Sequence, residues 1–150
     1  MRHSTKEHAK GSFAQHGHFE FEQAHGVVML NAYGPFNVET VRALGRTRTV
    51  GEVQWGFHKP RVALVVFHGS MLMSPDALQA YQEDLVEHFA KVTPPSAIAW
   101  VAGPAVEGRL LMCPHFEKIY RDFQIPWQSF ETTEQALPWL QAHLPHAPSL

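Results

Sequence analysis

The stretch Val62-Ala63-Leu64-Val65-Val66-Phe67 decides the fold class of this chain. It is an unbroken apolar run of strand length, it is rich in β-branched residues, and His68-Gly69-Ser70 follows it directly. Strands of this kind are covered on both faces, as in the interior of a mostly parallel sheet. The run therefore predicts a buried central strand over residues 62–67.

A long amphipathic helix is predicted soon after this strand. Ser74-Pro75-Asp76 is a helix start, with serine as N-cap, proline at the first helical position and an acidic residue in the first turn. Thr93-Pro94-Pro95 ends the helix. The apolar residues between these signals recur on one helical face, and they are Leu78, Tyr81, Leu85, Phe89 and Val92.

Two strands and a helix precede the central strand. Phe19–Glu22 alternates apolar and charged residues, and a second strand follows at Val27–Tyr33 after a turn at His25-Gly26. The short connection predicts an antiparallel hairpin. Asn37 is then the N-cap of a helix whose apolar residues reach Leu44.

The stretch over residues 46–60 is open to two interpretations. Gly45 and Gly51 weaken the helical pattern beyond Leu44. The stretch therefore fits either an extension of the preceding helix or a long loop.

The remaining elements alternate between strand and helix. Residues 97–101 and 127–130 are strand-sized, and a helical pattern follows each of them. Pro114 and Pro138 lie inside these two helical patterns. Pro114 predicts a kink or a split of its helix, and Pro138 predicts a local kink or a late start.

The complete order is strand-strand-helix-strand-helix-strand-helix-strand-helix. Thr132 and Gln135 have the spacing of a capping box, which marks the start of the last helix. Strands that alternate with helices after an opening hairpin predict an α/β layer fold. We expect a mixed sheet of about five strands with about four helices.

A single domain accounts for most of the chain, because 150 residues fit one domain and leave little room for two. Residues 1–18 are polar and show no periodicity, so we expect a flexible N-terminal tail followed by a domain over residues 19–146. His16 and His18 in this tail lack a third ligand and are a weak signal for a metal.

The composition disfavours several classes of function. A formal net charge of −2 and a pI of about 6.6 speak against a nucleic-acid or anionic-membrane partner. Cys113 is the only cysteine, so no internal disulfide forms. The first residues are polar and no apolar run approaches the ~20 residues of a membrane helix, so we expect a cytoplasmic protein. Eleven histidines make the net charge change sign on mild acidification.

This order of elements resembles the STAS domain of the anti-sigma factor antagonists, and its SpoIIAA-like branch in particular. Three places carry the resemblance: the hairpin that leads through Gly34-Pro35 into a helix, the strand over 62–67 followed by the helix at Ser74, and the segment Phe130–Leu140. That segment is similar to the F-x-x-x-x-x-A-x-x-W-L tail of SpoIIAA-like proteins. The resemblance covers residues 19–144.

The resemblance implies two modes of action. Classical members bind an anti-sigma kinase and are phosphorylated on a Ser or Thr, in a motif close to D-S-S-G, at the start of the helix after the central strand. Ser74 is the counterpart here, although Met73-Ser74-Pro75-Asp76 departs from that motif. The SpoIIAA-like branch also resembles lipid-carrying CRAL-TRIO domains in fold, which implies the binding of small apolar or amphipathic ligands.

Catalytic interpretations find little support in the sequence. His68-Gly69-Ser70 after a buried strand suits a hydrolase, but the chain lacks a G-x-S-x-G elbow. Cys113 and His115 are close in sequence but point apart on a helix, so we expect a buried, inert cysteine. The chain has no zinc motif and no glycine-rich phosphate loop, so we expect no metal and no cofactor.

The candidate binding site is a rim at the end of the central strand. Ligands in open α/β sheets bind beyond the C-terminal ends of strands, near helix N-termini. The residues of this rim are His68, Gly69, Ser70, Ser74 and Asp76. A basic stretch with Arg42, Arg46 and Arg48 is interpreted as a solvated helix face.

Three functions are compatible with these observations. The leading one is a non-enzymatic regulatory or protein-interaction module of STAS type, and an exposed apolar patch would favour it. The alternative is a carrier of a small apolar or amphipathic ligand, which requires an apolar pocket. The third is a hydrolase with a Ser or Cys within hydrogen-bond reach of a His. The identity of the partner and the oligomeric state, including a homodimer, stay open.

Overall fold

The sheet has six strands within the residues that this computed structural model describes, which are 2–4, 17–51 and 60–144. The strands are β1 (Arg2–Ser4), β2 (His18–Ala24), β3 (Val27–Tyr33), β4 (Val62–His68), β5 (Ile98–Val101) and β6 (Trp127–Phe130). The helices are α1 (Val38–Gly51), α2 (Pro75–Lys91), α3 (Arg109–Asp122) and α4 (Thr133–Gln141).

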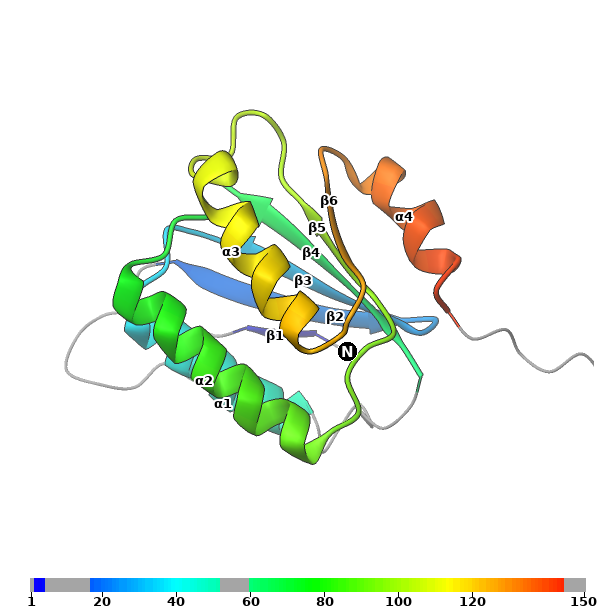
Figure 1. Cartoon of the computed structure of the whole chain (residues 1–150), viewed down its shortest axis with the longest axis horizontal. Helices are drawn as coiled ribbons and strands as arrows, with labels where there is room; N and C mark the ends of the chain where they lie inside the picture. The colour runs from blue at the N-terminus through cyan, green and yellow to red at the C-terminus, as the bar shows by residue number, and fades with distance from the viewer. Residues whose placement is uncertain (1, 5–16, 52–59, 145–150) are drawn as a thin grey trace, which may run out of the picture.

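The strands lie across the sheet in the order in which they follow along the chain (Figure 1). β1, β2 and β3 pair antiparallel, whereas β3, β4, β5 and β6 are parallel. Helices α1, α2 and α3 pack on one face of the sheet and α4 packs on the other. The expected α/β fold with a mixed sheet is confirmed.

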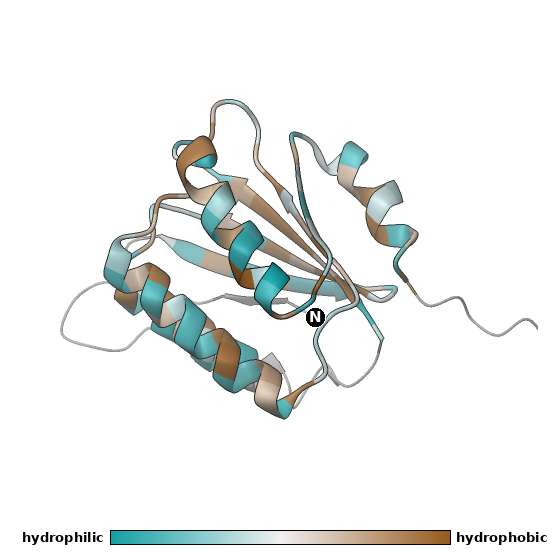
Figure 2. Cartoon of the chain, in the orientation of Figure 1, coloured by the Kyte–Doolittle hydropathy of each residue, from teal (hydrophilic) through white to brown (hydrophobic). Residues whose placement is uncertain are grey.

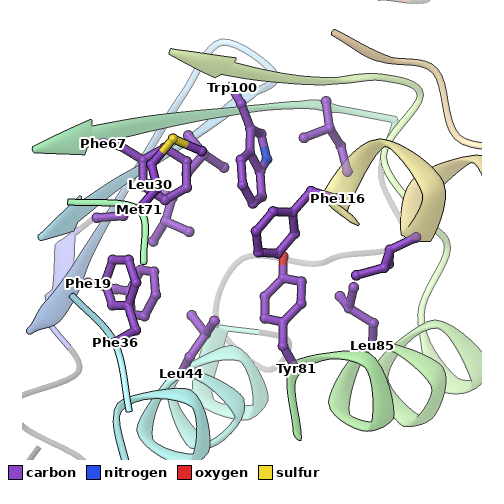
Figure 3. Packing of buried hydrophobic residues seen from close by; sticks show 14 of the residues in the cluster. Phe19, Leu30, Phe36, Leu44, Phe67, Met71, Tyr81, Leu85, Trp100 and Phe116 are labelled. Atoms are coloured by element: carbon purple, nitrogen blue, oxygen red, sulfur yellow. The ribbon is translucent and has the colours of Figure 1, made fainter. Parts of the chain in front are cut away.

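Strand β4 is the buried central strand that the sequence predicts. Val65 and Phe67 belong to the apolar core under α1, α2 and α3, whereas Val62 and Leu64 belong to a second core under α4. Successive residues of a strand point to opposite faces, so only a continuously apolar strand supplies both cores. In the larger core the ring of Trp100 on β5 lies against the rings of Phe67 and Phe116 (Figure 3).

Three helices begin at the N-caps that the sequence marks. The side chains of Asn37, Ser74 and Thr132 accept hydrogen bonds from the backbone N–H three residues later, at 3.0, 3.1 and 3.2 Å. Each bond satisfies one of the backbone donors that a helix start leaves without an intrahelical partner. The opening hairpin turns at His25 and Gly26, which both have positive φ, as the short hairpin turns require.

The N-terminal region departs from the prediction of a flexible tail over residues 1–18. Arg2–Ser4 pairs antiparallel with β2 as strand β1, and β2 itself begins at His18. β1 is therefore a sixth strand added to the five that the sequence predicts. A three-residue strand has too few residues for an alternating pattern to stand out in the sequence. Residues 1 and 5–16, including His16, lie outside the described residues.

Helix α1 resolves part of the ambiguous stretch over residues 46–60, because it continues through Gly51. Gly45 lies where α1 meets α2: a Cβ at this position would stand 2.5 Å from Oδ1 of Asp84. The glycine thus permits the close approach of two helices and does not end the first one. Residues 52–59 lie outside the described residues.

Helix α3 runs through Pro114 as a single element, so it is not split. Helix α4 starts at Thr133, ahead of Pro138, so the late start does not occur. Pro114 lies in the first half of α3, whereas Pro138 lies past the middle of the nine-residue α4. At Pro114 the missing N–H deprives only the carbonyl of Leu110, in the first turn, of its intrahelical partner.

Candidate functional site

The predicted rim lies where β3, β4 and β5 end and three loops meet. The loop after β4 is tied to the loop after β3 by a backbone bond from Phe36 N–H to the Leu72 carbonyl, 2.8 Å long. It is tied to the loop after β5 by the N–H of Glu107, which donates to the Gly69 carbonyl at 2.9 Å. The loops therefore form a connected edge of the sheet.

Ser70 is a structural member of this edge. Its side chain is buried, and its hydroxyl donates to Oε1 of Glu107 at 3.1 Å and accepts from the N–H of Leu72 at 3.1 Å. A Cβ at Gly34 would stand 2.1 Å from the Ser70 carbonyl oxygen, so the neighbouring loop packs directly against it. Ser70 thus holds the loops together and does not face a ligand.

Ser74 and Asp76 lie at the start of α2 and are exposed. The Ser74 hydroxyl accepts from the N–H of Ala77, which is the capping role that the sequence predicts. Asp76 is the acidic residue of the first helical turn, where a negative charge interacts favourably with the helix dipole. Gly69, also exposed, has a φ of +76°, a conformation that side chains rarely adopt.

His68 differs from the other rim residues because its ring lies in a stack of side chains. It is exposed, and it stacks on Tyr33 of β3, with ring centroids 4.5 Å apart. Tyr33 stacks in turn on His18 of β2, with centroids 4.4 Å apart. Sequence reasoning missed Tyr33 and His18, because only the strand register brings them beside His68.

The residues proposed for a hydrolase do not form a catalytic pair. Ser70 donates to Glu107, Ser74 caps a helix, and Cys113 is half-buried and hydrogen-bonded to Ser129. Burial raises the pKa of the Cys113 thiol, which disfavours the reactive thiolate. Within the described residues, no group of three or more His, Cys, Asp or Glu side chains is arranged to hold a metal ion.

A second candidate site is a cavity of about 80 Å³ between the sheet and α1, α2 and α3. Most of its lining is apolar, and Arg48, Tyr81 and Tyr120 bring polar atoms to it. Its other lining residues are Phe21, Val28, Leu30, Arg61, Ala63, Val65, Leu85, His88, Phe89, Pro95 and Ile98. The sequence assigns Tyr81 to the core and Arg48 to a solvated helix face, so it does not bring them together.

The polar groups of this cavity form a connected network. The guanidinium of Arg48 pairs with the carboxylate of Asp84 and lies 5.5 Å from the centre of the Tyr81 ring. The hydroxyls of Tyr81 and Tyr120 are hydrogen-bonded to each other. Burial, with the nearby Tyr81, raises the pKa of Tyr120 well above its ordinary value, so its hydroxyl stays protonated.

Burial also weakens the ionisation of two basic residues at the cavity. It lowers the pKa of Arg61 to about 10, which still leaves the guanidinium charged at neutral pH. Burial and the nearby charges of Arg48, Arg61 and Lys91 lower the pKa of His88 to about 3. The imidazole is therefore neutral in the folded protein at neutral pH, and the charge of the cavity wall comes from its arginines.

Comparison with solved structures identifies the fold. An uncharacterized protein of the DUF3478 family from Shewanella loihica PV-4, described as having a SpoIIAA-like fold, superposes with a TM-score of 0.53. The match covers 87% of this chain and 98% of that chain, at 18% sequence identity. This chain has a SpoIIAA-like fold. No family model and no curated protein matches its sequence.

The SpoIIAA-like fold of this chain exposes large apolar side chains on two helices. Leu110 is 90% exposed and Leu111 64%, both in the first turn of α3, and Val86 on α2 is 60% exposed. Figure 2 shows that the first turn of α3 is hydrophobic. A groove between α2 and α3 includes Val86 and is lined by Gln82, Val86, His115, Lys118, Ile119, Asp122 and Phe123. His115 lies one helical turn after Leu111 on α3.

No described helix is both long enough and apolar enough to cross a lipid bilayer.

Proposed function

We propose that this chain is a non-enzymatic regulatory module that binds a protein partner through α2 and α3. The contact region, named the α2–α3 surface, comprises Val86, Leu110, Leu111, His115 and Lys118. The observation that carries the proposal is the exposure of Leu110 and Leu111 beside each other on the first turn of α3. Scattered exposed apolar residues are normal, whereas contiguous ones mark interaction sites.

The fold supports the same proposal. SpoIIAA-like proteins resemble anti-sigma factor antagonists, which act by binding another protein. The groove between α2 and α3 adds charged groups of both signs, Lys118 and Asp122, around the apolar contacts. An apolar centre with a polar rim is the usual composition of a protein interface.

Site-specific photo-crosslinking in the cells that make the protein tests this surface. A benzophenone side chain at Leu111 is expected to give one adduct of defined mass, whereas the same group at Gln141, exposed on α4, is expected to give none. Leu110→Ser combined with Leu111→Ser should leave the unfolding midpoint nearly unchanged, because both residues are exposed. No adduct at Leu111, or equal adducts at both positions, would contradict the proposal. An adduct of twice the chain mass would identify the partner as a second copy.

We also propose Ser74 as the position at which phosphorylation would regulate binding. It is exposed and lies at the N-terminus of α2, where a helix favours negative charge. Asp76 opposes a phosphate at the same helix start. Mass spectrometry of the protein isolated from its own cells decides the point, because a peptide that carries Ser74 without phosphate under all growth conditions would refute it.

A second candidate function, the carriage of a small amphipathic ligand, is favoured by the cavity at Arg48, Tyr81 and Tyr120. A mostly apolar cavity with a few convergent polar groups is the usual form of a ligand site. Its volume of about 80 Å³ is below the ~150 Å³ of a cavity that holds benzene. A lipid-sized ligand therefore requires α2 to move away from the sheet, which places this function second.

Native mass spectrometry of the freshly purified protein tests the carrier function. A bound molecule that survives purification is expected to be lost in Ala63→Leu, which adds volume on the floor of the cavity without removing a polar group. A protein that carries no small molecule, or one whose bound molecule persists in Ala63→Leu, would contradict ligand carriage at this site.

A further inference from the structure

Three aromatic side chains form a continuous ladder across β2, β3 and β4. The ring ladder consists of His18, Tyr33 and His68, which occupy one row of the sheet because His18 pairs with Tyr33 and Tyr33 pairs with His68. The ring planes are nearly parallel, with interplanar angles of 8° and 13°. Their centroids are 4.4 and 4.5 Å apart, close to the ~4.8 Å between neighbouring strands. Each of the three neighbouring strands therefore contributes one ring to the stack.

Polar neighbours fix the two ends of the ring ladder. Nε2 of His68 lies 3.0 Å from Oδ1 of Asn31, within hydrogen-bond distance, and Asn31 is two residues before Tyr33 on β3. Nε2 of His18 lies 3.6 Å from Oε1 of Glu20. The outer ring of His68 is thus held in a defined plane before any ligand arrives.

The ring ladder ends at His68 although the sheet continues to β5. Pairing between β4 and β5 stops at Val66 and Val101, and His68 and Gly103 each follow two residues later. The next row position thus falls to a residue without a side chain. A Cβ at Gly103 would have Glu131 O, at 4.0 Å, as its nearest neighbour, so the space above it is open. His68 itself is exposed.

We propose that the exposed face of His68 binds a free small molecule with a planar heteroaromatic ring, which stacks over Gly103 as the fourth ring of the ladder. The site lies beyond the C-terminal ends of parallel strands, where open α/β sheets bind ligands. Ring stacking on an aromatic side chain is the interaction by which proteins hold nucleobases and similar flat rings. The net charge of −2 disfavours a nucleic-acid polymer as the source of the ring. This site is separate from the α2–α3 surface, so the two proposals stand or fall independently.

Titration of the full chain with adenosine, followed by NMR of the histidine ring protons, tests the site. Saturable upfield shifts of the His68 ring protons are expected, because stacked rings shield each other. His68→Ala should weaken binding about tenfold or more, the loss of one stacked base. His68→Phe keeps a flat ring on Tyr33 and should retain binding. Gly103→Leu places a side chain in the fourth position and should weaken binding without a steric conflict at Cβ.

Two controls separate binding from stability. His25→Asn, at an exposed histidine in the turn between β2 and β3, should leave the adenosine affinity unchanged. Each variant is compared with the wild type by its unfolding midpoint, so that a loss of binding caused by unfolding is recognised. A titration without a shift at His68, or equal affinity in wild type, His68→Ala and Gly103→Leu, would overturn the proposal. A single-stranded oligodeoxyadenylate that binds far more tightly than adenosine would overturn the assignment to a free small molecule.

Discussion

The guanidinium of Arg48 on α1 lies 2.5 Å from the carboxylate of Asp84 on α2, and both side chains are largely buried. The pair joins the two helices at the point where Gly45 lets them approach closely. It also holds Arg48 against the Tyr81 ring at the edge of the cavity. One ion pair therefore connects the packing of α1 on α2 with the polar network of the cavity.

Replacing Asp84 by Asn is expected to lower the free energy of unfolding by about 2 kcal/mol, because Arg48 would keep its charge and lose the charged acceptor. Urea denaturation measures this change. The matched control is Glu117→Gln, which removes the carboxylate of an exposed pair with Arg121 on α3. Its effect is expected to stay below about 1 kcal/mol. Equal effects of the two substitutions would show that burial does not strengthen the Arg48–Asp84 pair.

Replacing Ser74 by Ala is expected to lower the free energy of unfolding by about 1 kcal/mol, because the N–H of Ala77 loses its acceptor. Ser74→Asn keeps a side-chain oxygen for the same N–H and should retain most of the stability. The unfolding midpoints of the two variants check this order. If Ser74→Ala unfolds at the same denaturant concentration as wild type, the cap contributes nothing and Ser74 is retained for another reason.

Local sequence signals predicted most of the elements of this fold. Continuous apolar character marked β4, and the caps at Asn37, Ser74 and Thr132 marked the starts of three helices, because each signal involves residues that are close in the chain. Gly45 left the length of α1 open in the prediction, because its role depends on a contact with Asp84 on another helix.

The sites were less predictable than the elements. The rim residues follow one strand in sequence, yet Ser70 is buried and Ser74 caps a helix, so their chemistry depends on neighbours such as Glu107. The stack of His18, Tyr33 and His68 depends on the register of three strands. The cavity draws residues from three helices and four strands. No short motif in the sequence encodes any of these three arrangements.

Removing residues 1–16 is expected to speed hydrogen exchange at the backbone amides of Glu20–Glu22. These residues pair with β1 in the register Arg2 with Glu22 and Ser4 with Glu20, so without β1 the strand β2 becomes an open sheet edge. The amides of β4, an interior strand, serve as the control and should keep their protection. Unchanged exchange at Glu20–Glu22 in the truncated protein would show that β1 does not protect β2 in solution.

His88 is expected to make the folded state less stable as the pH falls below about 6.5. Burial and nearby positive charges lower its pKa from 6.5 to about 3 in the folded protein, so between these values the unfolded chain binds a proton that the folded chain does not. The free energy of unfolding therefore falls on acidification, by at most ~1.4 kcal/mol per pH unit from this group, and less where solvent screens it.

His88→Gln removes this contribution. Its stability should decline less than that of wild type between pH 6.5 and 5, whereas His115→Gln, at an exposed position on α3, should follow wild type. Urea denaturation at the two pH values measures the difference, and parallel declines in wild type and His88→Gln would contradict a neutral, half-buried His88.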